Sequence, residues 1–191
     1  ATNVTEETRI KVQRAADQLN FTLSKSASAL ASGKTMRVIL LVSGKLNEWF
    51  NSGVLQGVYE ELAPVGYDVT PAFITDRSEL DRFFSQLSKS RNADAIIISS
   101  FQLMPAMRDQ LQAIDLPTVG VNVPAESGYF DASISIDNSS AMTMAVRLLR
   151  SLGHTNIAFC SDYIPADMVY NTSQRTQAFA DAAQANACLL Y

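Results

Sequence analysis

The sequence predicts an α/β protein built on a doubly wound parallel sheet. From Lys34 onward, short apolar runs alternate with longer segments whose apolar residues recur at helical spacing. Runs such as residues 37–43 and 93–99 are apolar throughout, as in strands that are buried on both faces. This strand–helix order predicts parallel strands, right-handed crossovers and helices on both faces of the sheet. A chain of 191 residues can bury the core that such a fold needs.

Six buried strands are expected, each a short run rich in Val, Ile, Leu or Ala. The third contains three consecutive isoleucines, Ile96, Ile97 and Ile98. The strands are predicted at residues 37–43, 67–73, 93–99, 117–121, 132–136 and 156–160. Open sheets of this kind bind ligands at the carboxyl ends of their strands. We therefore expect a ligand site among the loops 44–51, 74–77, 99–104, 122–131, 137–140 and 161–175.

Helices are expected between these strands and after the last one. Their apolar residues fall on one face, as with Leu80, Phe83, Phe84 and Leu87. The helices are predicted at residues 51–65, 78–90, 105–114, 138–152 and 171–187.

The N-terminal segment predicts a separate amphipathic helix over residues 5–19. Thr5 is a suitable N-cap, and Glu6 and Glu7 in the first turn suit the helix dipole. The apolar stripe of this helix is formed by Val12, Ala15, Ala16 and Leu19. A helix of this length is not stable alone in water, so we expect it to pack on another element.

Residues 24–33 are small and polar, which allows two interpretations. The first is a flexible linker. The second is a short helix ended by Gly33, on which Ala27, Leu30 and Ala31 share one side.

Charge is distributed unevenly along the chain. Residues 1–37 hold six basic and three acidic residues, a net charge of +3, whereas the whole chain carries −4. A basic leader on an acidic body is typical of a protein whose one end meets phosphate.

Several classes of function lack their sequence signals. The two cysteines, Cys160 and Cys188, fit neither a metal site nor a disulfide framework, which favours a reduced, cytoplasmic chain. No signal peptide or membrane-length apolar run is present, so no membrane association is expected. We find no catalytic triad order, glycine-rich phosphate loop or metal motif, and therefore expect no enzyme activity, cofactor or metal.

Motifs along the whole chain together resemble the LacI/GalR-type family of bacterial transcription regulators. Those that resemble the third headpiece helix and the hinge helix are residues 4–9, 12, 15–16 and 19–21, then 27–35. Those that resemble the sensor domain are residues 38–42, 47–50, 135–138, 152–154 and 157–158, with Arg175 and Phe179. The chain departs from the family pattern at Leu23, where a proline is usual, and at Ala178, where a glycine is usual. Val169 replaces an arginine of purine-responsive members, which argues against a purine corepressor.

The resemblance implies a domain organisation and a function. Residues 1–23 would be the end of a helix-turn-helix headpiece without its recognition helix, and residues 24–34 the hinge. Residues 35–153 would form the first subdomain of a periplasmic-binding-protein-like sensor, and residues 154–191 the start of the second. The implied function is a ligand-responsive repressor that binds operator DNA and a sugar-like effector as a homodimer or tetramer. The alternative is a periplasmic-type sugar-binding protein without DNA binding.

The resemblance also implies which residues contact DNA. Thr5, Thr8 and Ser24 would donate hydrogen bonds to phosphates. Leu30 would enter the minor groove beside the same residue of a second subunit, while Ala27 and Ala31 let the two hinge helices approach.

Residues expected at the ligand cleft combine aromatic faces with polar groups. Asn47, Trp49 and Phe50 follow the first strand, although such an aromatic pair also fits the core. Arg175 can bind a carboxylate, a phosphate or paired hydroxyls through two N–H groups. Asp137 either accepts from a ligand hydroxyl or ties two segments together. Phe101, with the neighbouring Ser100, would form a wall.

Overall fold

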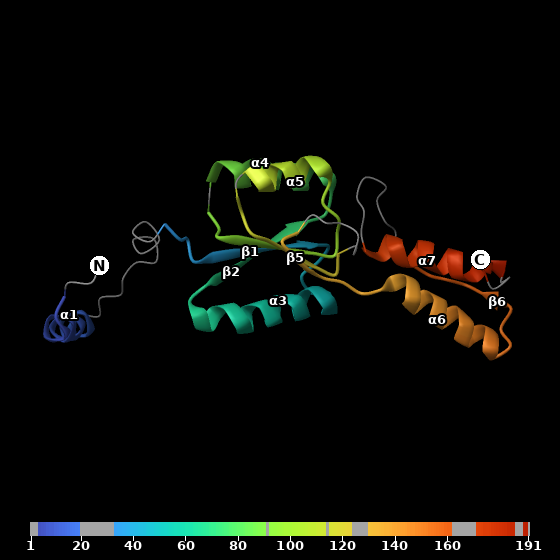
Figure 1. Ribbon diagram of the computed structural model, residues 1–191, viewed down its shortest axis with the longest axis horizontal. Coiled ribbons are helices and arrows are strands. Elements are labelled where there is room, and N and C mark those ends of the chain that lie inside the picture. Colours follow the sequence, from blue (N-terminus) through green and yellow to red (C-terminus); the bar gives the residue numbers. More distant parts are fainter. Residues whose placement is uncertain are drawn as a thin grey trace. The chain divides into compact units, whose positions relative to one another are not determined.

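A computed structural model describes residues 4–19, 33–90, 92–113, 115–123, 130–161, 171–185 and 189–190 (Figure 1). The chain divides into two compact units, Ala1–Met36 and Arg37–Tyr191. Each unit is described by itself.

The larger unit is built on a five-stranded sheet in which every neighbouring pair is parallel. The strand order is β2-β1-β3-β4-β5. The strands are β1 (Arg37–Ser43), β2 (Asp68–Ile74), β3 (Ala95–Ser99), β4 (Thr118–Val121) and β5 (Ala132–Ile134). The predicted parallel sheet is thus confirmed. β5 ends two residues earlier than predicted, and the side chains of Ile134 and Ile136 are exposed.

Helices cover both faces of this sheet. α3 (Trp49–Leu62), extended by the 3₁₀ turn η1 (Ala63–Val65), lies on one face, whereas α4 (Arg77–Ser90) and α5 (Pro105–Ala113) lie on the other (Figure 1). The side chains of β1 alternate between the faces: Ile39 and Leu41 join the core beneath α4 and α5. Leu80, Phe84 and Leu87 of α4 are buried in the same core, as predicted.

A second, smaller core lies further along the chain. It is formed by α6 (Asn138–Ser151), β6 (Asn156–Ile157) and α7 (Asn171–Ala185), with β7 (Leu189–Leu190) paired to β6. Its buried side chains are Val146, Ile157, Phe179, Ala182 and Ala183. α6 contributes Val146 to this core and packs against α7. β6 is shorter than the predicted 156–160, and β7 was not predicted.

The N-terminal unit contains α1 (Glu6–Gln18), which begins after Thr5 as expected. None of its residues is buried, and Val12 and Leu19 on the predicted apolar stripe are 64% and 78% exposed. Residues 24–32 of the predicted hinge lie outside the described residues. Among the described helices, none has the length and apolar content that crossing a bilayer requires.

Asp137 explains why α6 begins at Asn138. Its carboxylate accepts a hydrogen bond from the Ser140 backbone N–H at 2.9 Å, which caps the helix. Hydrogen bonds from the side chain and the backbone of Ser140 lower the pKa of Asp137 below its ordinary value of 3.8. A carboxylate with a lowered pKa in the folded state stabilises the fold above that ordinary value, and this contribution disappears as the pH falls through the lowered pKa.

We expect Asp137→Ala to lower the melting temperature at neutral pH because the cap is lost. The deficit should shrink toward zero in strongly acidic solution, where the carboxyl of the unsubstituted protein is protonated. Thermal melts at a series of pH values test this, with Asp109→Ala, an exposed carboxylate in the middle of α5, as the control. A deficit that is the same at every pH would exclude the cap as its cause.

Gly120 allows Phe130 to pack on β4. A Cβ at this position would lie 2.6 Å from a Val123 methyl carbon and 2.8 Å from the Phe130 ring. Both contacts are shorter than real Cβ atoms show, and Gly120 is buried in the sheet.

Gly120→Ala should therefore destabilise the protein by about 1–3 kcal/mol, the usual effect of overpacking. Urea denaturation followed by circular dichroism measures it. Gly53→Ala is the matched control, because a Cβ there meets nothing within 4 Å and its helix should tolerate it. Equal stability of the two variants would contradict this packing.

Candidate functional site

Buried asparagines and a serine lie where β3, β4, α6 and α7 meet. Asn122 follows β4, Asn138 begins α6 and Asn171 begins α7, and their exposed fractions are 9%, 5% and 1%. Asn138 Nδ2 donates to Asn171 Oδ1 at 2.6 Å, and Asn171 Nδ2 donates to Asn122 Oδ1. Asn122 Nδ2 donates in turn to Ser100 Oγ, just after β3, at 3.1 Å. We call this series the asparagine ladder.

Backbone hydrogen bonds reinforce the asparagine ladder. Asn171 N donates to Ser100 O at 3.1 Å, Ser100 N to Val121 O at 2.9 Å, and Asn122 N to Ile134 O at 2.7 Å. Ser100 and Asn122 have φ values of 71° and 52°, in the left-handed region that few residues other than glycine adopt. Asparagine adopts this region more readily than serine does, so Ser100 in particular must be held there by the surrounding structure. Residues held in this way cluster at functional sites.

Arg175 extends the ladder toward a pocket. Its Nε donates to Asn138 Oδ1 at 3.0 Å, and the side chain is half-buried. The pocket measures about 420 Å³ and is lined by Met142, Phe159, Cys160, Ser161, Thr172 and Arg175. Phe159 stacks on Phe179 with ring centroids 4.8 Å apart, which supports one wall. The pocket thus combines an aromatic wall with a guanidinium and hydroxyl groups, as small-ligand sites do.

The loop after β1 is shaped by Gly44, Glu48 and Asn51. Gly44 has φ 80°, and the Asn51 side chain, 3% exposed, donates to Ser43 O at 2.8 Å and Lys45 O at 3.1 Å. The predicted ligand residues Trp49 and Phe50 begin α3, two residues earlier than expected, and their rings meet edge to face with centroids 5.6 Å apart.

The other predicted ligand residues do not gather at one site. Trp49 is 84% exposed and Asn47 is also exposed, and neither lines the Arg175 pocket. Asp137 is exposed, does not line the Arg175 pocket and caps α6. Phe101 is 0% exposed and belongs to the main core, so its ring cannot form a ligand-contacting wall in this conformation. Of the predicted six, only Arg175 lines the pocket.

The asparagines were not among the predicted site residues, although the loops that contain them were. Each directly follows a strand or begins a helix. The available signal was that the same residue type recurs at three such positions. The sequence pattern did not show that they hydrogen-bond to one another, because they are separated by 16 and 33 positions.

Only two of the predicted DNA-binding residues are described. Thr5 and Thr8 are exposed, and their hydroxyl oxygens lie 2.9 Å apart at the start of α1. Ser24, Ala27, Leu30 and Ala31 lie outside the described residues. On the same helix Arg9 and Lys11 pair with Glu6 and Glu7, but these exposed pairs are weak enough to be exchanged for phosphate.

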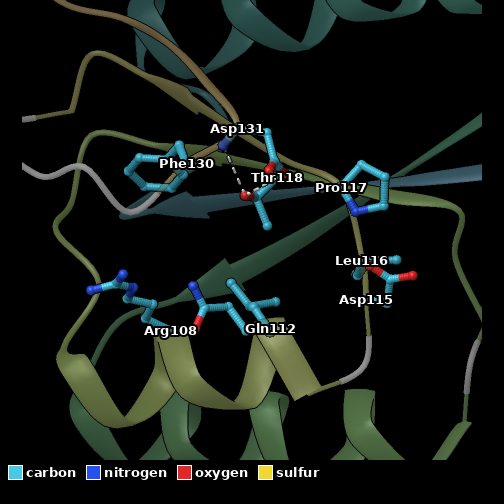
Figure 2. A pocket seen from close by; sticks show the side chains of 9 residues that line it. Arg108, Gln112, Asp115, Leu116, Pro117, Thr118, Phe130 and Asp131 are labelled. Carbon is cyan, nitrogen blue, oxygen red and sulfur yellow. Dashed lines mark hydrogen bonds between the residues drawn. The ribbon is translucent and has the colours of Figure 1, made fainter.

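A further hollow of about 330 Å³ lies beside the first residue of β4 (Figure 2). Arg108 and Gln112 of α5 point toward it, and Phe130 and Asp131 lie across from them. The Asp131 carboxylate already accepts from Thr118 N at 2.7 Å and Thr118 Oγ1 at 3.1 Å. This hollow lies at the amino end of its strand, whereas ligands of such sheets bind at the carboxyl ends. The Arg175 pocket is therefore the stronger candidate.

No protein-family model matches the chain. The chain is 30% identical over 162 residues to the HTH-type transcriptional repressor PurR of Vibrio cholerae, which covers 84% of this chain and 47% of that protein. It is 27% identical over 177 residues to the ribose operon repressor of Lactococcus lactis, covering 92% and 51%. The chain thus spans about half the length of the curated relatives it matches.

Solved structures show the same fold. The Lac repressor dimer bound to operator and the anti-inducer ONPF matches 100% of this chain and 56% of its own, with a TM-score of 0.78 and 18% identity. A LacI-family regulator of Weissella paramesenteroides with bound glucose matches 81% and 58%, with a TM-score of 0.63 and 19% identity. The sequence similarity to named repressors along most of this chain, in a chain whose fold is also that of LacI-family regulators, identifies it as a member of the LacI/GalR-type family.

Proposed function

We propose that this protein is a DNA-binding repressor whose sensor pocket at Arg175 binds a sugar or related polyol. The observation that carries the effector half of this proposal is the hydrogen bond from Arg175 to buried Asn138 at the edge of the pocket. A guanidinium held in this way keeps further N–H groups for a ligand, and these suit paired hydroxyl oxygens.

The relatives support a sugar as the effector class. Structural neighbours include a regulator with bound glucose, the CelR–cellobiose complex and a Lactobacillus casei regulator with bound sucrose. A purine effector is the alternative, and it is supported by sequence similarity, since the PurR repressor of Vibrio cholerae is a relative. Val169, which stands where purine-responsive members carry an arginine, favours the sugar.

The DNA-binding half of the proposal rests on the N-terminal unit. Residues 1–37 carry a net charge of +3 on an acidic chain, and α1 presents the Thr5 and Thr8 hydroxyls at its start. The uncovered apolar stripe of α1 needs a partner, which the preceding helices of a complete headpiece would supply. Leu30, flanked by Ala27 and Ala31, would act as the minor-groove wedge of a paired hinge.

A homodimer would couple the two halves. Tyr59 of α3 and Val65 of the following turn η1 are 60% and 63% exposed, and Val58 and Leu62 of α3 are half-buried. We propose that α3 pairs with the same helix of a second subunit. Ligand binding would then shift an equilibrium between two sensor conformations that differ in the distance between the hinges.

We expect Arg175→Ala to abolish the effector response while leaving DNA binding intact. Thermal-shift assays of the intact protein with glucose, sucrose, cellobiose and ribose identify the responding sugar, and operator binding is followed by fluorescence anisotropy. The variant should reduce affinity for that sugar by about a hundredfold, because removing one partner of a charged hydrogen bond costs about 1.5–3 kcal/mol per bond. Arg147→Ala, on the exposed side of α6, is the control. An unchanged sugar response in Arg175→Ala would remove Arg175 from the site.

We expect Leu30→Ala to weaken specific operator binding by about tenfold or more, with little change in binding to non-specific duplex. The reason is that an inserted leucine stabilises only the bent, specific complex, whereas phosphate contacts serve both. Titrations with both duplexes at two salt concentrations measure this, and Leu46→Ala in the sensor is the control. Equal losses on the two duplexes would contradict the wedge, and no binding at low salt would favour the sugar-binding protein without a DNA role.

A further inference from the structure

The hydrogen bonds of the asparagine ladder all run in one direction. Arg175 donates to Asn138, Asn138 to Asn171, Asn171 to Asn122, and Asn122 to Ser100. Each asparagine accepts through its carbonyl oxygen on the side of Arg175 and donates through its amide nitrogen on the far side. Nothing in the chemistry of asparagine requires this order, because an amide can be turned over by rotating one bond.

Arg175 is the group that imposes the order. A guanidinium has five N–H donors and no acceptor, so the atom of Asn138 that faces it must be the oxygen. The Asn138 nitrogen then faces Asn171, which must present its own oxygen, and the same reasoning continues through Asn122 to Ser100. A charged donor at the head of such a chain also polarises each following amide and strengthens its bond.

We propose that Asn138 is a positioning residue for the Arg175 guanidinium, to which it presents its side-chain oxygen, while its amide nitrogen anchors it to the buried Asn171. This inference rests on the proposed function of Arg175 and concerns the regulation of that same site. The ladder joins the pocket to the residues after β3 and β4, where Ser100 and Asn122 have left-handed backbone conformations. A ligand that draws the Arg175 side chain away from Asn138 would break the first hydrogen bond of the ladder. The change would then be transmitted along the ladder to β3 and β4 through Ser100 and Asn122.

Two substitutions of Asn138 separate positioning from mere packing. Asn138→Asp keeps an oxygen for Arg175 and adds opposite charge, and Asn171, Asn122 and the Ser100 hydroxyl can all be satisfied by turning over. Asn138→Leu has nearly the volume of asparagine but offers Arg175 no acceptor and leaves the Asn171 oxygen without its donor. If Asn138 only fills space, leucine is the milder change, because a buried charge is then the more costly one.

The experiment compares both variants in the intact protein by two readouts. The first is the solvent-exchange rate of the Arg175 Nε–H, measured by ¹⁵N NMR without any ligand. The second is the affinity for glucose, sucrose, cellobiose and ribose. We expect Asn138→Asp to keep the Nε–H protection and the sugar affinity within about threefold, and to move the Asn171 and Asn122 side-chain amide signals. We expect Asn138→Leu to speed the exchange and to weaken sugar binding by about tenfold each.

The controls are Asn156→Asp and Asn156→Leu, because Asn156 is exposed on β6 and takes no part in the ladder. Protection retained in Asn138→Leu, or lost in Asn138→Asp, would overturn the inference. If Asn138→Leu does not fold, retained protection in Asn138→Asp supports the inference and its loss overturns it. If none of the four sugars binds the unsubstituted protein, the proposed effector class fails, while the exchange rates still decide the role of Asn138.

Discussion

The hydrogen-bonded amides between the strand ends and the starts of α6 and α7 are the constraint on which the functional architecture depends. Asn171 holds both Asn138 of α6 and Asn122 after β4 through its side chain, and its backbone N–H bonds to Ser100 after β3. The three asparagine side chains are buried, and their polar groups would be costly if left unsatisfied. The junction therefore selects one arrangement of four chain segments, and that arrangement brings Arg175 to the head of the ladder.

This junction also explains how the two hydrophobic cores remain distinct while belonging to one unit. The main core fills the space between the sheet and α4 and α5, whereas the second is built from α6, β6 and α7. Apolar packing holds each core together, but between them the described contacts include directional hydrogen bonds. Hydrogen bonds within the protein can be exchanged for hydrogen bonds to a ligand at little net cost in free energy, whereas close-packed apolar surfaces cannot be separated so readily. A junction of this composition is compatible with the change between two sensor conformations that we propose.

The sequence by itself determined the fold class and the positions of most elements. Continuous apolar runs identified the five strands of the main sheet, and β1 was predicted to the residue, because burial on both faces leaves an unmistakable pattern. Helical spacing likewise located α1, α3, α4, α5, α6 and α7 within a few residues. The rule that ligands bind at the carboxyl ends of parallel strands selected the loops that contain Ser100, Asn122, Asn138 and Asn171.

Only the tertiary structure decided which of these residues act together. Phe101 was expected at a ligand wall and is buried in the core, because the pattern of residue types does not show toward which side a loop side chain turns. An amphipathic helix such as α6 specifies that it needs a partner but not which one, and the structure pairs it with α7. The ladder joins residues 22 to 49 positions apart through single hydrogen bonds. Such contacts depend on how the sheet and the helices meet in space, and no local pattern of residue types encodes them.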